Sequence, residues 1–476
     1  MDYFKTSFYS IAFIVSDYLA IIVAQYFALA IRVDVLGDYL EIMPLKWQTP
    51  VIYEYAIIPG VFIGFCYLER LYSRRQLFWE MAANVFRAGV YTCFVWLLLF
   101  FVTKDIAQLS RPYFIILWVI AVPTVLLLRY LTKKSLLHFG LWQTKTLLVG
   151  SGKSAEKILC AAMNDAGMGY SFVGRIGDSV ITDYPTLSRL DYLGGIDELE
   201  RVLQQIHCQD VIIATQGISS DKLIELVFRA QPLVKNVSFL PDIIGVPVMG
   251  LETQTLVNEK TIMLKVKNNL AVKHNRMFKV LFDWIISVCG LLIFVPLFIL
   301  LAIMIFIDSP GKIIFSHTRV GHNGRKFPCY KFRTMALDAA GKLKNHLESS
   351  PDAAAEWERD FKLKNDPRVT RVGRFLRATS LDELPQFLNV LKGEMSLVGP
   401  RPIVEAEITK YQEYIADYYL VRPGITGWWQ VHGRNDVSYE DRVQMDSWYV
   451  RNWSLWLDIE LLVKTLDAVF AKRGAY

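Results

Sequence analysis

The sequence contains few cysteines, and they form no metal-binding or disulfide pattern. Six cysteines are scattered through 476 residues, without a Cys-x-x-Cys pair and without histidines at zinc-ligand spacing. This arrangement excludes a zinc module and a disulfide framework, so we expect reduced and mostly buried thiols. The excess of positive charge is also small, with 52 basic against 46 acidic residues, and acidic residues are interspersed among the basic ones. We therefore expect no nucleic-acid partner.

Charged residues make up only 21% of the chain, whereas hydrophobic residues make up 53%. This balance is too apolar for a purely soluble or disordered protein, and too charged for a chain that lies wholly within a membrane. Four apolar stretches are long enough, or nearly so, to cross a hydrocarbon layer of about 30 Å. They are residues 8–31, 51–68, 86–103 and 113–131. We expect an integral membrane α-helical bundle of four transmembrane helices over residues 1–135.

The loop charges predict how this bundle is oriented. Loop 69–87 and the segment after the fourth stretch are rich in Arg and Lys, whereas loop 32–50 is richer in acids. By the positive-inside rule, the N-terminus and the chain after residue 132 lie in the cytoplasm. Asp17 and Glu54 lie within apolar stretches, and we favour pairing inside the bundle over a transport path. One hypothesis is that the bundle binds a partner or forms the interface of a homodimer.

Residues 140–262 alternate between strand and helix patterns, as in a Rossmann-like α/β domain. A buried strand pattern runs into Gly150 and Gly152, and Ala155 completes a Gly-x-Gly-x-x-Ala motif that opens a helix. Further parallel strands are predicted at 171–174, 210–214 and 237–240. The acid that would bind a ribose is replaced by Gly174 and Arg175. We therefore interpret this domain as a structural or regulatory module.

A further apolar segment, residues 277–307, contains Pro296 in its middle. Thirty-one residues of helix would extend about 46 Å, which is more than one crossing requires. A proline inside a helix removes a hydrogen bond and kinks the axis. The residues allow either a fifth span or a helix–break–helix that enters one leaflet and returns. These two alternatives place everything after residue 308 on opposite sides of the membrane.

The region after residue 308 is dense with motifs suited to phosphate binding. Arginine binds phosphate oxygens through two parallel hydrogen bonds, and glycine and proline hold the backbone close and stiff. The motifs are Arg-Val-Gly at 319–321, Lys-Phe-Arg-Thr-Met at 331–335, Arg-Val-Gly-Arg at 371–374, Gly-Pro-Arg-Pro at 399–402 and Gly-Arg-Asn-Asp at 433–436. Together with the acidic pair Asp382 and Glu383, they predict a site for an anionic substrate and a divalent metal.

The acidic pair itself allows two interpretations. Ser380 with Glu383 fits a helix capping box, in which the acid has only a structural role. Alternatively, Asp382 attacks phosphorus while Glu383 holds a hard cation such as Mg²⁺. In both cases we expect a helix that begins near Pro385. Its expected buried face consists of Leu384, Leu388 and Leu391.

The order of these motifs resembles the bacterial polyprenyl-phosphate hexose-1-phosphate transferases, also called monotopic phosphoglycosyl transferases. The resemblance covers residues 274–476, and the bundle and Rossmann-like domain resemble the large members of the family. It rests on the proline-broken helix and on the motifs at 331–335, 380–386, 396–402, 423–427 and 433–436. It implies an α/β catalytic domain with a re-entrant membrane helix at 277–307, on the cytoplasmic face of the bacterial inner membrane.

The resemblance also implies a reaction. Hexose-1-phosphate would pass from a UDP-hexose to undecaprenyl phosphate with release of UMP, the first membrane step of O-antigen, capsule or exopolysaccharide synthesis. The ending at 472–476 resembles the branch that transfers galactose, so we favour UDP-galactose over UDP-glucose. Asp382 would be the nucleophile of a ping-pong mechanism, and Asp382 and Glu383 would hold Mg²⁺. The substrate-binding residues carried over are Lys331, Arg333, Arg377, Arg401, Pro402 and Arg434.

Two other classes of protein remain as alternatives. A membrane-anchored sugar-nucleotide dehydratase or epimerase shares the bundle and Rossmann-like layout, but it needs a catalytic Tyr-x-x-x-Lys pair. The pair found, Tyr130 and Lys134, lies upstream at the membrane edge. The second alternative is a non-catalytic scaffold. Trp448, Trp453 and Trp456 either pack in a core or lie in the lipid headgroup layer, where tryptophan is enriched, and we favour the headgroup layer.

Overall fold

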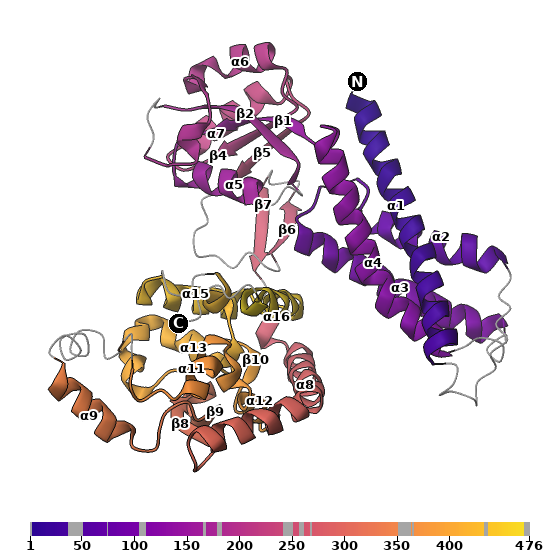
Figure 1. Cartoon of the computed structure of the whole chain (residues 1–476). Helices are drawn as coiled ribbons and strands as arrows, with labels where there is room; N and C mark the ends of the chain where they lie inside the picture. The colour runs from indigo at the N-terminus through magenta and orange to yellow at the C-terminus, as the bar shows by residue number, and fades with distance from the viewer. Residues whose placement is uncertain are drawn as a thin grey trace. The chain divides into compact units, whose positions relative to one another are not determined.

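The computed structural model describes residues 2–36, 51–73, 75–103, 111–164, 168–178, 183–240, 251–256, 261–266, 269–350, 363, 366–432 and 437–470. The chain forms two compact units, Met1–Ile243 and Ile244–Tyr476 (Figure 1). All six cysteines are free, as the sequence predicts.

The first unit begins with apolar helices. They are α1 Asp2–Ala30, α2 Ile58–Leu68, α3 Phe78–Thr103 and α4 Arg111–His138, with π-helical turns at Ile31–Val35 and Tyr53–Ile57. Helical segments Phe8–Val35, Phe78–Leu99 and Pro112–His138 are long and apolar enough to cross a membrane, whereas Tyr53–Leu68 is shorter. The four predicted apolar helices are thus present, and the third begins earlier than the sequence pattern indicated.

A buried ion pair joins α1 to α4. Arg129 Nε donates to Asp17 Oδ1 at 2.7 Å and Nη2 to Oδ2 at 2.5 Å, while Tyr72 Oη donates to Oδ2 at 2.6 Å. Both charged side chains are buried, at 1% and 0% exposure. The prediction that Asp17 is paired within the bundle is confirmed. Because neither charge reaches solvent, each depends on the other for compensation.

We predict that Arg129→Leu destabilises the first unit by about 3–5 kcal/mol, because it leaves the Asp17 carboxylate buried without a counter-charge. The double variant Asp17→Leu/Arg129→Leu should recover most of this loss, since it buries no charge. Unfolding of the detergent-purified full chain measures both variants. Equal destabilisation of the single and double variants would contradict this account of the pair.

The remainder of the first unit is a five-stranded parallel sheet with strand order β3-β2-β1-β4-β5. Its strands are β1 Thr144–Val149, β2 Tyr170–Ile176, β3 Tyr192–Gly194, β4 Asp210–Ala214 and β5 Asn236–Leu240. The helices are α5 Lys153–Asn164, α6 Leu199–Ile206 and α7 Ser220–Ala230. This strand order matches five of the six strands of the Rossmann order 3-2-1-4-5-6, as expected for the predicted Rossmann-like domain. The short strand β3 had no sequence signal of its own.

The second unit is an α/β fold built from short sheets and helices. Its strand pairs are β6 Leu251–Leu256 with β7 Thr261–Val266, β8 Ile314–Val320 with β9 Lys326–Phe332, and β10 Ser396–Val398 with β11 Gly424–Thr426. The helices are α8 Lys273–Asp308, α9 Ala339–Ser349, α11 Arg371–Ala378, α12 Gln386–Leu391, α13 Ile415–Leu420, α14 Trp428–His432, α15 Tyr439–Arg451 and α16 Leu455–Phe470. Three-residue 3₁₀ turns include η9, Leu381–Glu383, and a longer one is η10, Glu405–Tyr414.

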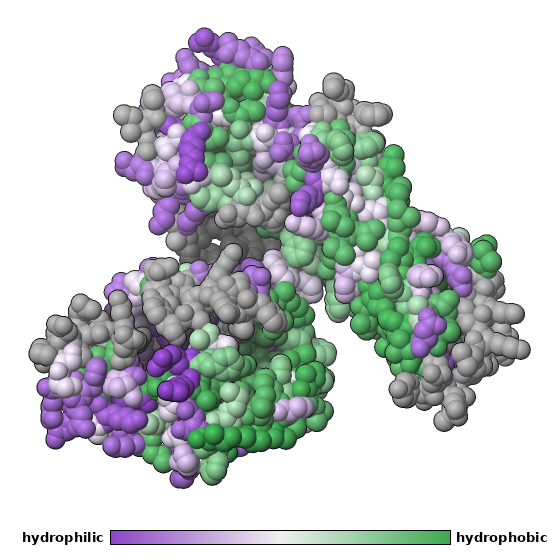
Figure 2. Space-filling model, in the orientation of Figure 1, coloured by the Kyte–Doolittle hydropathy of each residue, from purple (hydrophilic) through white to green (hydrophobic). Residues whose placement is uncertain are grey.

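Helix α8 carries most of the apolar surface of this unit. It is 36 residues long, includes Pro296, and is long and apolar enough to cross a membrane. Figure 1 shows that α8 changes direction along its length, and Figure 2 shows apolar side chains gathered over it. Exposed apolar residues in its second half include Leu292, Ile293, Ile299, Leu300, Ile303, Phe306 and Ile307. The predicted apolar segment 277–307 lies within α8.

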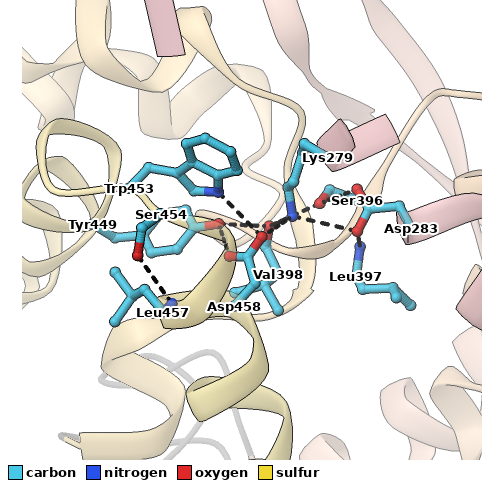
Figure 3. Close-up of polar contacts among 10 residues, drawn as sticks. All are labelled: Lys279, Asp283, Ser396, Leu397, Val398, Tyr449, Trp453, Ser454, Leu457 and Asp458. Carbon is cyan, nitrogen blue, oxygen red and sulfur yellow. Dashed lines mark hydrogen bonds and ion pairs between the residues drawn. The ribbon is translucent and has the colours of Figure 1, made fainter. Parts of the chain in front are cut away.

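A buried polar network attaches the beginning of α8 to the rest of the unit (Figure 3). Lys279 Nζ lies 2.7 Å from Asp458 Oδ2 and 3.3 Å from Asp283 Oδ1. Asp283 in turn accepts from Ser396 Oγ at 2.7 Å and from the backbone N–H of Leu397 at 3.4 Å. One ammonium group therefore links α8 to both β10 and α16.

The Asp458 carboxylate also accepts from Tyr449 Oη at 2.7 Å and from Trp453 Nε1 at 3.1 Å. Trp453 is buried in the core of the unit, so the prediction that it lies in the headgroup layer is wrong. Its indole N–H is needed by a buried carboxylate, which explains why the amphipathic side chain lies inside.

The end of α8 packs on the same unit. Leu301 and Ile305 lie in a cluster with Phe332 and Leu376, and Asp308 Oδ2 accepts from the backbone N–H of Val372 at 3.0 Å. Both ends of the helix therefore contact one globular body.

Candidate active site

A cavity of about 950 Å³ opens in the second unit between β9, α11, η9 and α14. Its walls include six of the predicted site residues: Lys331, Arg333, Arg377, Asp382, Glu383 and Arg401. Pro402 does not line it, and its carbonyl accepts from Arg319 Nη1 at 3.3 Å. Arg434 lies outside the described residues. The cavity thus joins both predicted carboxylates to four of the predicted cationic residues.

The acidic pair faces the end of strand β9. Lys331 Nζ lies 2.6 Å from Glu383 Oε1 and 3.6 Å from Asp382 Oδ2. The Asp382 side chain is 13% exposed, whereas that of Glu383 is 33% exposed. The two neighbouring carboxylates therefore differ in environment, and Asp382 is the more desolvated.

This environment shifts the protonation of both partners. Burial raises the pKa of Asp382 above its ordinary value, Glu383 adds to the shift, and Lys331 and Arg377 oppose it. For Lys331, burial alone would lower the pKa, but Glu383 and Asp382 outweigh it and raise the pKa. Lys331 therefore stays charged near neutral pH. It can stabilise an ionised carboxylate and attract an anion.

The backbone before the acidic pair is left-handed. Ser380 has φ of 56° and makes no capping hydrogen bond, so the capping-box interpretation is wrong. A non-glycine residue in this region is uncommon and marks local strain. Helix α12 begins after Pro385, as expected, but it buries Gln386, Asn389 and Val390. The predicted face of Leu384, Leu388 and Leu391 is only partly buried, because the 3₁₀ turn changes the phase of the helix.

Asn389 fixes α12 against β9. Its Oδ1 accepts from the backbone N–H of Tyr330 at 3.0 Å, and its Nδ2 donates to the Pro328 carbonyl at 2.7 Å and to Glu394 Oε2 at 2.6 Å. The side chain is fully buried. Since Lys331 follows Tyr330 directly, these bonds hold Lys331 at the distance seen from the acidic pair.

The cation Arg377 is placed by the close approach of α11 to the Lys-Phe-Arg-Thr-Met motif. A Cβ atom at Gly373 would collide with the Thr334 carbonyl, so only glycine allows this packing. One turn later, Arg377 Nε donates to Thr334 Oγ1 at 3.0 Å. The Arg-Val-Gly-Arg motif therefore positions Arg377 beside the cavity.

Arg333 lines the cavity and also contacts the end of α8. Its Nη2 donates to the carbonyl of Ser309, the residue that follows α8. This contact stabilises the carbonyl end of the apolar helix, where a cation is favourable. Arg333 therefore links the cavity to the end of α8.

Some cavity residues were missed by sequence reasoning, notably Phe387 and Trp429. Trp429 is buried at 8% exposure and is the second residue after the Pro-Gly-Ile-Thr-Gly motif. The position of Trp429 just after that motif was the one sequence signal that could have identified it as a site residue. An apolar or aromatic side chain in a run of core residues otherwise indicates packing.

The carboxylates of Asp382 and Glu383 suit Mg²⁺ better than a metal ion whose ligands all come from protein side chains. The described residues contain no cluster of three or more His, Cys, Asp or Glu side chains that could hold a metal. Mg²⁺ commonly uses one or two protein carboxylates and takes its other ligands from water and substrate phosphates. Asp382 and Glu383 fit that donor set.

The Gly-x-Gly-x-x-Ala turn of the first unit is filled by a side chain. Gln216 Oε1 accepts from the backbone N–H of Ser154 at 3.1 Å, and a Cβ atom at Gly152 would lie 3.0 Å from that oxygen. This is where a dinucleotide phosphate would approach the helix N-terminus. The geometry therefore favours the cavity of the second unit as the functional site.

Two protein-family models match the chain. The bacterial sugar transferase model matches residues 274–472, and the CoA-binding domain model matches residues 62–241. The chain is 37% identical over 469 residues to undecaprenyl-phosphate galactose phosphotransferase from Salmonella typhimurium, covering 97% of this chain and 96% of that protein. The chain belongs to the bacterial sugar transferase family. It is an enzyme of the phosphoglycosyl transferase class.

Two further relatives differ in the sugar that their names specify. UDP-galactose-lipid carrier transferase from Erwinia amylovora is 35% identical over 478 residues, covering 99% of this chain and 98% of that protein. UDP-glucose:undecaprenyl-phosphate glucose-1-phosphate transferase from Escherichia coli is 31% identical over 337 residues, covering 69% and 68%. The predicted family is confirmed, and the dehydratase and scaffold alternatives are set aside.

We predict that Asn389→Leu destabilises this transferase by about 2–3 kcal/mol, because buried partners in β9 lose their hydrogen bonds. Thermal unfolding of the full chain measures the change. Asn345→Leu on the exposed face of α9 is the matched control and should change stability by less than about 0.5 kcal/mol. Equal stability of the two variants would contradict the role assigned to Asn389.

Proposed function

We propose that this transferase moves galactose-1-phosphate from UDP-galactose to undecaprenyl phosphate, giving undecaprenyl-diphosphate galactose and UMP. The observation that carries the proposal is the partly buried Asp382 beside Lys331 in a cavity that also presents Arg377 and Arg401. The full-length relatives with galactose in their names favour this sugar, and glucose is the alternative. We place the reaction in the first membrane step of O-antigen, capsule or exopolysaccharide synthesis.

In the proposed mechanism, ionised Asp382 attacks the β-phosphorus of the UDP-sugar. A bond forms between its carboxylate oxygen and phosphorus, and the bond to the bridging oxygen breaks, so that UMP leaves with that oxygen and its electron pair. The lipid phosphate then attacks the same phosphorus and releases Asp382 as carboxylate. Lys331, Arg377 and Arg401 bind the phosphate oxygens throughout.

Asp382 and Glu383 would hold Mg²⁺. When bound, this cation neutralises negative charge on the diphosphate and on the departing phosphate. The chain's own contribution is to keep Asp382 ionised and aimed into the cavity. Lys331 supplies the fixed charge for that purpose, because it contacts both carboxylates.

We further propose that α8 is re-entrant and that the catalytic unit lies on the cytoplasmic face of the inner membrane, in a homodimer. The support for the topology is that Lys279 and Asp283 near the start of α8 and Asp308 at its end all bond to the same globular body. A straight helix of this length would separate its ends by about 54 Å. Pro296 lies between the two anchored parts.

The topology predicts that cysteines introduced at His274 and Lys312, which are exposed at the two ends of α8, face the same compartment. A membrane-impermeant maleimide should label both in inside-out vesicles and neither in cells with an intact inner membrane. The unsubstituted chain, with its native cysteines, gives the background. Labelling of the two positions from opposite sides would establish a span.

The function is tested by UMP release from detergent-purified protein with Mg²⁺, undecaprenyl phosphate and either UDP-galactose or UDP-glucose. We expect release with UDP-galactose and loss of essentially all turnover in Asp382→Asn, because a neutral amide is no nucleophile. Release from UDP-glucose alone would change the sugar but keep the reaction. Release by neither sugar, or an active Asp382→Asn variant, would overturn the proposal.

The pKa shift of Asp382 predicts a pH dependence. Because the carboxylate must be ionised to attack, UMP release should fall as pH falls through a pKa that burial holds above the ordinary value of 3.8. Residual activity of Lys331→Met should fall at a higher pH still, because the opposing cation is gone. Lys326 lies on the same strand as Lys331 and pairs with Glu405 at the surface. Lys326→Met should therefore leave the pH profile of UMP release unchanged. An inflection at the ordinary value would refute the shift.

A further inference from the structure

Arg401 reaches the cavity without a polar anchor for its side chain. It is exposed and lines the cavity wall, and within the described part of the chain its guanidinium has no hydrogen-bond or ion-pair partner. A flexible cation of this kind loses conformational entropy when it binds an anion. Any contact that restricts it in advance therefore raises its affinity for phosphate.

The side chain that restricts Arg401 is Trp429. The Arg401 guanidinium carbon lies 5.8 Å from the centre of the Trp429 ring, within the range of a cation–π contact. Trp429 is itself buried at 8% exposure and lines the same cavity. The indole thus offers a rigid face beside an otherwise unanchored arginine.

Helix α15 brings a second cation to this indole. The Arg442 guanidinium carbon lies 4.0 Å from the same ring centre. One turn further along α15, Asp446 is buried at 2% exposure and accepts from Tyr411 Oη at 2.8 Å. Burial raises the pKa of Asp446 to about 7, and the hydrogen bond from Tyr411 and the charges of Arg442 and Arg401 oppose this shift. When ionised, its carboxylate offsets the repulsion between the two guanidinium groups near one ring.

We propose that Trp429 is the positioning residue of Arg401, held in place by Arg442 and Asp446 of α15, and that it sets the affinity for the diphosphate of the sugar nucleotide. This inference rests on the proposed function, in which Arg401 binds phosphate. Trp429 acts through Arg401 and has no chemical step of its own.

The test is a double-mutant cycle on the full-length enzyme in detergent, with the KM for UDP-galactose from UMP release and the affinity for UMP as readouts. Trp429→Leu should raise the KM and weaken UMP binding about tenfold, while Trp429→Phe, which keeps an aromatic face, should lose about threefold or less. In an Arg401→Ala background, Trp429→Leu should change the KM for UDP-galactose and the UMP affinity by less than about a further twofold, because the group that Trp429 positions is absent.

The adjacent Trp428 provides a matched control. It stacks on His432, contacts the ring of Trp448 at a tilt and does not line the cavity. Trp428→Phe should therefore leave the KM for UDP-galactose within about twofold. If Trp429→Leu does not fold, Arg442→Met tests the same claim by removing the second cation at the ring, and its effect should also vanish in the Arg401→Ala background.

Additive losses in the cycle would overturn the inference, because they would mean that Trp429 contacts substrate directly or acts only on stability. An unchanged KM in Trp429→Leu would overturn it as well. Neither result contradicts the proposed function as long as the unsubstituted enzyme releases UMP. Absence of UMP release and of UMP binding by the unsubstituted enzyme would instead remove the proposed function itself.

Discussion

The position of α8 depends on one buried ammonium group. Lys279 compensates two carboxylates, Asp283 on α8 and Asp458 on α16, in a region where either acid alone would be costly. The same carboxylates accept hydrogen bonds from Ser396 on β10 and Tyr449 on α15, so the network joins four elements, α8, β10, α15 and α16. Contacts between apolar side chains and lipid are non-directional, so they do not by themselves fix the position of a long helix against its own domain. This network fixes its first turns against the strand that leads into the Gly-Pro-Arg-Pro motif.

In the cavity, as at the start of α8, one ammonium group contacts two carboxylates. Burial makes the Asp382 carboxylate harder to ionise, yet the proposed role as a nucleophile requires the ionised form. Lys331 resolves this conflict by contacting both acids, and Asn389 holds its strand against α12. The site therefore combines a desolvated carboxylate, the proposed nucleophile, with a fixed cation. The cost of desolvation is offset by tertiary contacts far from the acidic pair in sequence.

Much of the fold could be predicted from the sequence, because apolar helices and buried parallel strands have strong patterns. The motifs also identified Asp382, Lys331 and Arg377, whose residue types suit phosphate chemistry. What could not be predicted depends on tertiary packing. The left-handed backbone at Ser380 has no local signature in a serine. Trp429 resembles any core aromatic residue until its neighbours are known.

The central claim is that Asp382 forms a covalent bond to the sugar phosphate. The most direct measurement is the intact mass of the full-length protein after incubation with UDP-galactose and Mg²⁺ without lipid acceptor, followed by peptide mapping. The account predicts a mass increase of one hexose phosphate on the peptide that contains Asp382, lost on addition of undecaprenyl phosphate and absent in Asp382→Asn. UMP release without any covalent adduct, or an adduct on another residue, would contradict it.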